Sequence, residues 1–110
     1  MITIRIKRDK NTFIQSFEMS GHANSGPYGQ DLVCAAVSAV SIGTINAIHT
    51  LTGVNLVSDV EEEGGFIHCD VPSNLPKETF DNVQLLMEGM IVSLKSIEEE
   101  YGKFIQINEN

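Results

Sequence analysis

The stretch "SGHANSGPYGQDLVCAAVSAVS", residues 20–41, joins two different kinds of sequence pattern. It begins at the end of an alternating segment, continues through glycine, proline, serine and asparagine, and ends in a run of small apolar residues. The middle part is typical of a loop, because these residues favour turns. The stretch therefore predicts a strand that ends near Ser20, a mobile loop over about residues 23–31, and a helix over about residues 32–51 that Gly53 terminates.

An N-terminal hairpin is expected before this stretch. Residues 2–7, "ITIRIK", alternate isoleucine with polar residues, which is the pattern of a strand with one buried face. Residues 8–11, "RDKN", supply a turn, and alternate positions then continue as a second strand. Those positions are Phe13, Gln15, Phe17 and Met19.

A second hairpin and a second helix are expected after it. Strands are predicted over residues 56–61 and 66–71, with Gly64 and Gly65 in the turn between them. "SNLP" then opens a helix with Ser73 or Asn74 as its cap, Gly102 ends that helix, and residues 103–107 form a last strand. Apolar residues recur in this helix every three or four positions: Phe80, Val83, Met87, Met90, Leu94, Ile97 and Tyr101.

The element order predicts an α+β fold with the sequence ββαββαβ. We expect a single layer of mostly antiparallel sheet with five strands, packed with two helices. A length of 110 residues, 42% of them apolar, suits one domain over residues 1–110.

The charge of the chain excludes some partners. With 15 acidic and 7 basic residues, the formal net charge is −8. Phosphate backbones repel such a protein, so we expect no direct contact with nucleic acid, whereas a basic peptide would be attracted. The simpler alternative is that the acidity only keeps the protein soluble.

We expect a cytoplasmic protein. Met1 leads directly into the first strand, without the pattern of a signal peptide, and polar residues interrupt the apolar run over residues 32–51, so no membrane span is expected. The three histidines and two cysteines lack metal-ligand spacing, so neither a metal nor another cofactor is expected.

Cys34 is the candidate nucleophile. It lies just after the predicted helix start, where free backbone N–H groups and the helix dipole favour a thiolate. His22, at the other end of the loop, could act as its base and then as its acid. The alternatives are a buried core cysteine and a surface histidine.

Asp31 and Ser38 have two possible roles each. Asp31 caps the helix or orients His22. Ser38, one turn after Cys34, donates to the sulfur or bonds back to the carbonyl four residues earlier.

The remaining candidates are interpreted as structural. Cys69 shares a strand face with Ile67 and is expected in the core, while His68 points to the opposite face, either solvated or at a subunit contact. His49 suits a helix C-terminus. The two "EEE" runs, at residues 61–63 and 98–100, are interpreted as a turn flank and a solvated helix end.

The segments "GHA", Gly21 to Ala23, and "DLVCAAVS", Asp31 to Ser38, resemble the ribosomal-processing cysteine protease family called Prp, and the element order agrees with it. The resemblance implies an endopeptidase that removes the N-terminal extension of large-subunit ribosomal protein twenty-seven. It implies Cys34 as nucleophile and His22 as partner, with Gly21 in the same motif, and a homodimer.

Two other function classes stay open. One is a ribosome-assembly protein that binds a peptide without cutting it. The other is a redox sensor that uses Cys34 but does not need His22.

Overall fold

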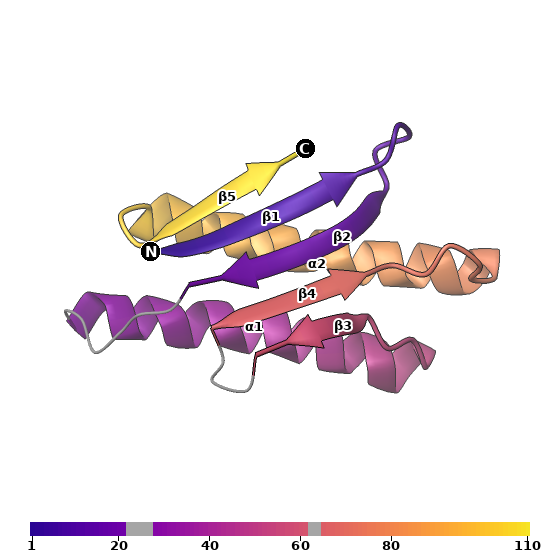
Figure 1. Cartoon of the computed structure of the whole chain (residues 1–110), viewed down its shortest axis with the longest axis horizontal. Helices are drawn as coiled ribbons and strands as arrows, with labels where there is room; N and C mark the ends of the chain where they lie inside the picture. The colour runs from indigo at the N-terminus through magenta and orange to yellow at the C-terminus, as the bar shows by residue number, and fades with distance from the viewer. Residues whose placement is uncertain (22–27, 62–64) are drawn as a thin grey trace.

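The computed structural model describes residues 1–21, 28–61 and 65–110, and of residues 28–31 only the backbone. Along the described chain the elements follow the predicted order ββαββαβ (Figure 1). They are β1 (Ile2–Arg8), β2 (Ile14–Ser20), α1 (Tyr28–Thr52), β3 (Val57–Val60), β4 (Phe66–Asp70), α2 (Lys77–Tyr101) and β5 (Ile105–Glu109). The predicted α+β class is confirmed.

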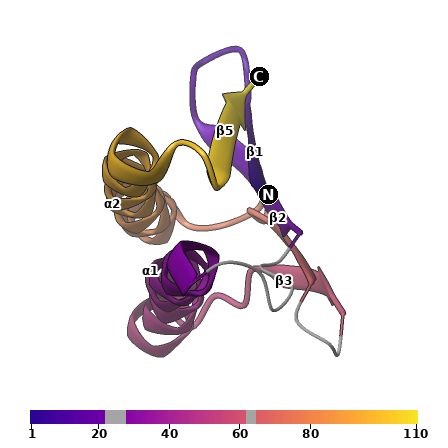
Figure 2. The same cartoon turned by 90° about the vertical axis from the view of Figure 1, so that its left-hand side faces the viewer.

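The five strands form one open sheet with the order β3-β4-β2-β1-β5. Three of its neighbouring pairs are antiparallel, and β1 pairs with β5 in parallel. The parallel pair arises because α2 carries the chain back along the sheet before β5 begins. Figure 2 shows both helices on the same face of the sheet, and no helix of the described chain covers the other face, which we call the uncovered face.

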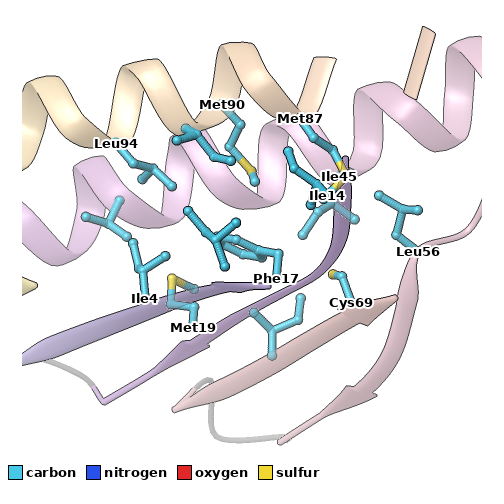
Figure 3. Packing of buried hydrophobic residues seen from close by; sticks show 14 of the residues in the cluster. Ile4, Ile14, Phe17, Met19, Ile45, Leu56, Cys69, Met87, Met90 and Leu94 are labelled. Atoms are coloured by element: carbon cyan, nitrogen blue, oxygen red, sulfur yellow. The ribbon is translucent and has the colours of Figure 1, made fainter. Parts of the chain in front are cut away.

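The core lies between the sheet and the two helices. In Figure 3, Ile4 and Phe17 point from the sheet toward Met90 and Leu94 of α2, and all four are buried. Each such side chain contributes roughly 1.5–3 kcal/mol by leaving water. The apolar stripe predicted for the second helix is therefore the core-facing side of α2.

The second strand differs from its predicted alternation. Lys7 pairs with Ser16 but Arg8 pairs with Ile14, so a bulge at Gln15 shifts the register by one residue. Ile14 is consequently buried, whereas Phe13 is 43% exposed and lies edge-on to Phe80 outside the sheet. The predicted alternation that starts at Phe13 is therefore broken at Gln15, because a bulge reverses the alternation behind it.

The first helix begins earlier than predicted. Residues 28–31, expected in the loop, form the first turn of α1, while the rest of the predicted loop, residues 22–27, lies outside the described residues. The predicted end is confirmed, because Gly53 has φ +78° and its N–H donates to the carbonyl of His49 at 2.9 Å.

The start of the second helix was also predicted too early. α2 begins at Lys77, directly after Pro76, and no side chain caps it, so neither Ser73 nor Asn74 has the expected role. Its end at Tyr101 agrees with the prediction, although Gly102 has right-handed φ. The last three strands lie within two residues of their predicted bounds.

Residues 32–52 of α1 are long and apolar enough to cross a membrane by length and composition alone, with a mean hydropathy of 1.7. The expectation that polar interruptions exclude such a helix was wrong, because none of the interrupting residues is charged. In the fold, Val33, Val37 and Ile48 of this segment are buried in the common core. Packing against the core therefore explains why this side of α1 is apolar.

Candidate active site

Cys34 lies in the second turn of α1, as the seventh residue of the helix that starts at Tyr28. The side chain is partly buried and packs against the edge of the core. The free N–H groups of the helix start belong to residues 28–31 and not to Cys34 itself. Because a helical side chain tilts toward the N-terminus, the sulfur is nevertheless directed over that first turn.

The end of β2 is held at Gly21. Its N–H donates to the carbonyl of Gly65 at 3.0 Å, which ties the end of β2 to the residue before β4. Its φ is +85°, and a Cβ at this position would overlap the carbonyl oxygen of Met1. Only glycine fits here, so the chain leaves the sheet toward His22 at a defined point.

The two halves of the candidate site lie at the same end of the molecule. Figure 1 shows the end of β2 and the start of α1 toward the same, left-hand end of the molecule, where α1 extends beyond the strand, and Figure 2 shows α1 on the helix-covered side of the sheet. His22 itself lies outside the described residues. The structure thus places Cys34 and Gly21, while the predicted pairing of Cys34 with His22 stays a prediction.

The two supporting residues on α1 are placed differently. Asp31 is the fourth helical residue, so the predicted N-cap role was wrong, because a cap residue precedes the helix. Its side chain lies outside the described part of the chain. Ser38 is partly buried one turn after Cys34, on the same face, and among the described residues it forms neither a back-bond to the carbonyl of Cys34, as Thr44 and Thr52 do to theirs, nor a hydrogen bond to the Cys34 sulfur.

The second cysteine is structural, as predicted. Cys69 is 1% exposed on the helix-facing side of β4. Burial, with a smaller contribution from the charge of Asp70, raises the pKa of its thiol to about 11. This residue is therefore protonated at neutral pH and unsuited to nucleophilic attack.

Two charged groups have contacts that the sequence did not reveal. His68, on the uncovered face, contacts the carboxylates of Glu18 and Asp70. Glu98, interpreted as part of a solvated helix end, accepts a hydrogen bond from the N–H of Ile107 at 2.7 Å. The register of β2 with β4 creates the Glu18–His68 contact, and the Glu98–Ile107 contact joins α2 to β5, so local spacing reveals neither, whereas Asp70 lies only two residues from His68 on the same strand.

A shallow groove of about 500 Å³ runs between α1 and α2, away from the sheet. Small residues line much of it, among them Gly43, Ala47 and Gly89. Cys34 does not line this groove, so the groove is a feature separate from the candidate site. Within the described ranges, no three His, Cys, Asp or Glu side chains gather as a metal site would require.

Comparison with known proteins covers the whole chain. Residues 1–106 match the family described as cysteine protease Prp. The ribosomal processing cysteine protease Prp of Bacillus subtilis is 44% identical over 110 residues, covering 100% of this chain and 98% of that protein. The protein of the same name from Staphylococcus aureus is 39% identical over 109 residues, covering 98% of each.

Solved structures agree with this assignment. The S. aureus protease Prp in complex with a substrate peptide superimposes with a TM-score of 0.86 and 36% identity, covering 100% of both chains. The same protease with a covalently linked product peptide gives a TM-score of 0.85 and 37% identity, again covering 100% of both chains. Fold, motif residues and full-length similarity agree, and the chain belongs to the Prp family of cysteine proteases.

Proposed function

We propose that this cysteine protease removes the N-terminal extension of large-subunit ribosomal protein twenty-seven during ribosome maturation, with Cys34 as nucleophile and His22 as its partner. The observation that carries the proposal is the position of Cys34. It is the partly exposed cysteine, and it lies at the end of the molecule where β2 leads into His22. The names of the relatives, ribosomal processing proteases, support the substrate class.

The proposed reaction proceeds through an acyl-enzyme. The Cys34 thiolate attacks the carbonyl carbon of the scissile peptide bond, and backbone N–H groups in the first turn of α1 receive the negative charge on the oxygen. The His22 imidazolium gives its proton to the departing amine. Water then attacks the thioester while His22 takes a proton from it, which releases the acid and restores the thiolate–imidazolium pair. The covalently linked product peptide of the S. aureus protease is consistent with such an intermediate.

Three residues support these two in the proposal. Gly21 defines where the chain leaves β2, one residue before His22. Asp31, no longer a candidate cap, would orient the imidazole, and Ser38 would donate to the sulfur from one turn away. Movement of the loop over residues 23–27 during substrate binding stays a prediction, as does the extent of the single domain over residues 1–110.

The acidity of the chain suits this substrate. A net charge of −8 favours approach of a basic ribosomal protein segment and disfavours direct contact with RNA. Because the proposed substrate belongs to the ribosome, we propose the cytoplasm as the place of action.

Incubation with the full-length ribosomal protein of the same organism tests the proposal, with a shortened product detected by mass spectrometry. We expect loss of cleavage in Cys34→Ala and His22→Ala, and near-normal cleavage in the matched controls Cys69→Ala and His49→Ala. Cleavage that persists in Cys34→Ala would contradict the mechanism. Binding of the substrate without any product would favour the non-catalytic binding protein, and loss in Cys34→Ala alone would contradict the role of His22.

We further propose a homodimer that forms through the outer faces of α1 and α2. Leu85, which lines the groove, is 72% exposed, and Val92, seven residues later on α2, is 65% exposed. The floor of the groove is open at Gly43 and Gly89, where an added Cβ meets nothing within 4 Å. In a twofold dimer, the apolar ridge of one copy can enter the groove of the other.

Sedimentation of the wild type and of Val92→Asp tests the dimer. We expect the substitution to shift the protein toward monomer while leaving its circular dichroism unchanged. A wild type that sediments as a monomer at every concentration would contradict the proposal. Glu99→Ala, at an exposed position near the end of α2, provides a control.

A further inference from the structure

His68 lies between two carboxylates on the uncovered face of the sheet. Its Nδ1 is 3.2 Å from Oε1 of Glu18 on β2, and its Nε2 is 3.0 Å from Oδ1 of Asp70 on its own strand. The His68 side chain is 29% exposed, so water does not fully screen these contacts. Both ring nitrogens therefore face acceptors.

This geometry favours the charged form of the imidazole over the neutral form. A neutral imidazole carries one N–H, so it can donate to only one of two ionised carboxylates and directs a lone pair at the other. The imidazolium donates to both. Consistent with this, the hydrogen bond that His68 donates to Asp70, together with that to Glu18, outweighs the effect of burial and raises the pKa of His68 above its ordinary value.

The charges around His68 alternate across four strands. Glu18 also accepts a hydrogen bond from Arg5 of β1 at 3.2 Å. Residues that pair across neighbouring strands form a row. The row through His68 runs from β1 to β3, and the adjacent row runs from β1 to Asp70 on β4. The charged residues in these two rows, His68 apart, are Arg5, Glu18 and Asp59 in the first, and Lys7 and Asp70 in the second.

Glu18, which contacts His68, lies three residues before Gly21 in the chain. We call the Gly21–Gly65 hydrogen bond the anchor of the candidate active site. Glu18 pairs with His68, and two residues further Ser20 pairs with Phe66. The next residue of β2 is Gly21, which donates to Gly65 and precedes His22. The cross-strand ion pair and the Gly21 hydrogen bond therefore hold the same two strands together.

We propose that His68 is a protonation-dependent brace between β2 and β4, and that its deprotonation loosens the Gly21–Gly65 anchor at the candidate active site. The linkage has a definite sign. Because the pKa of His68 is raised in the folded protein, its contact with Glu18 stabilises the β2–β4 pair fully at a pH below the ordinary histidine pKa. This stabilisation is lost as the pH rises through the raised pKa. The effect on cleavage rests on the proposed role of His22, whereas the effect on the anchor does not.

Two NMR measurements on the full chain test the brace. The first follows the ring resonances of the histidines against pH, and we expect Glu18→Gln to shift the His68 midpoint downward, with the His49 signal as an internal reference. The second follows amide exchange at Gly21, corrected for intrinsic base catalysis. We expect its protection to fall roughly 2- to 5-fold across the His68 titration, the range that a partly exposed ion pair provides.

Two controls separate the brace from a general loss of stability. Ile2 donates to Phe104 at the start of the neighbouring β1–β5 pair and should show no step at the His68 midpoint. Asp70→Asn removes the carboxylate that lies on the same strand as His68, so it should shift the step to lower pH without abolishing it. Glu18→Gln should abolish the step.

Two results would overturn the brace. One is an amide protection of Gly21 that changes with pH in parallel with that of Ile2, and the other is a titration midpoint of His68 that Glu18→Gln leaves unchanged. In a peptide cleavage assay we expect kcat/KM to fall with the same midpoint in the wild type, and this decline to be absent in Glu18→Gln. A protein that cleaves no substrate at any pH would contradict the proposed function. The amide exchange data would still show whether deprotonation of His68 loosens the Gly21–Gly65 hydrogen bond.

Discussion

Replacing Gly21 by alanine should destabilise the protein much more than the same replacement at Gly53. Both glycines have positive φ, +85° and +78°, a conformation that costs an alanine about 1–2 kcal/mol. Alanine also restricts the unfolded chain, which offsets about 0.4–1 kcal/mol of that cost. Gly53→Ala, where an added Cβ meets nothing within 4 Å, should therefore lose only about 1 kcal/mol.

Gly21→Ala carries two additional costs. The new Cβ would overlap the carbonyl oxygen of Met1, and this backbone cannot withdraw freely because the next residue, Ile2, donates to Phe104 at 2.9 Å. If the Gly21 backbone moves instead, its hydrogen bond to Gly65 is weakened, at about 0.5–1.5 kcal/mol. We therefore expect a total loss of about 2 kcal/mol or more.

Urea unfolding followed by circular dichroism measures both variants. At roughly 4 °C per kcal/mol for a domain of this size, thermal unfolding should show Gly21→Ala lower by about 8 °C and Gly53→Ala by about 4 °C or less. Equal destabilisation of the two variants would refute the reasoning, because it would mean that the contact with Met1 has no energetic effect.

Three further outcomes are expected. Iodoacetamide at pH 8 should alkylate Cys34 in the native protein and spare Cys69, whose pKa of about 11 and burial keep it a protonated, inaccessible thiol; native labelling of Cys69 in a peptide digest would contradict its placement. Ser41→Ala should raise the unfolding free energy by about 1 kcal/mol, because the Ser41 hydroxyl is buried without a hydrogen-bond partner among the described residues, and a loss of stability would contradict this. The bidentate hydrogen bond from Arg8, at 2.8 Å to each oxygen, lowers the pKa of Glu88, so this carboxylate stabilises the fold above its ordinary pKa and the effect is lost as the pH falls through the lowered value. Glu88→Gln should accordingly be less stable than the wild type at pH 7, with a difference that disappears in acid; a difference independent of pH would exclude the ion pair as its cause.

Local patterns predicted the elements and most of their faces. Alternating isoleucines in β1 and the three- and four-residue spacing in α2 indicate directly which side is buried, because side chains repeat every two residues in a strand and about every 3.6 in a helix. The boundaries were less accurate. The bulge at Gln15 and the start of α1 at Tyr28 depend on neighbouring strands and on packing, which a local pattern does not contain.

The sequence suggested residues for the candidate site but not their contacts. The pattern from Gly21 to Cys34 suggested the cysteine and the histidine as site residues, which stays a prediction, and it carried the resemblance to Prp, which the family match confirms. It also suggested that Asp31 caps the helix, and this was wrong because the three residues directly before Asp31, expected in the loop, already have the backbone conformation of a helix. The roles of Met1 and Gly65 at the strand end were missed, since both are distant in sequence from Gly21.

By itself the sequence determined the class of fold, the core faces and the chemistry available at residues 22 and 34, because these depend on residue types and short spacings. Tertiary structure alone decided the strand order, the parallel pairing of β1 with β5, and the contact of His68 with Glu18. The physical reason is that such contacts join residues up to a hundred positions apart. Their geometry is set by sheet register and helix packing, which exist only once the chain has folded.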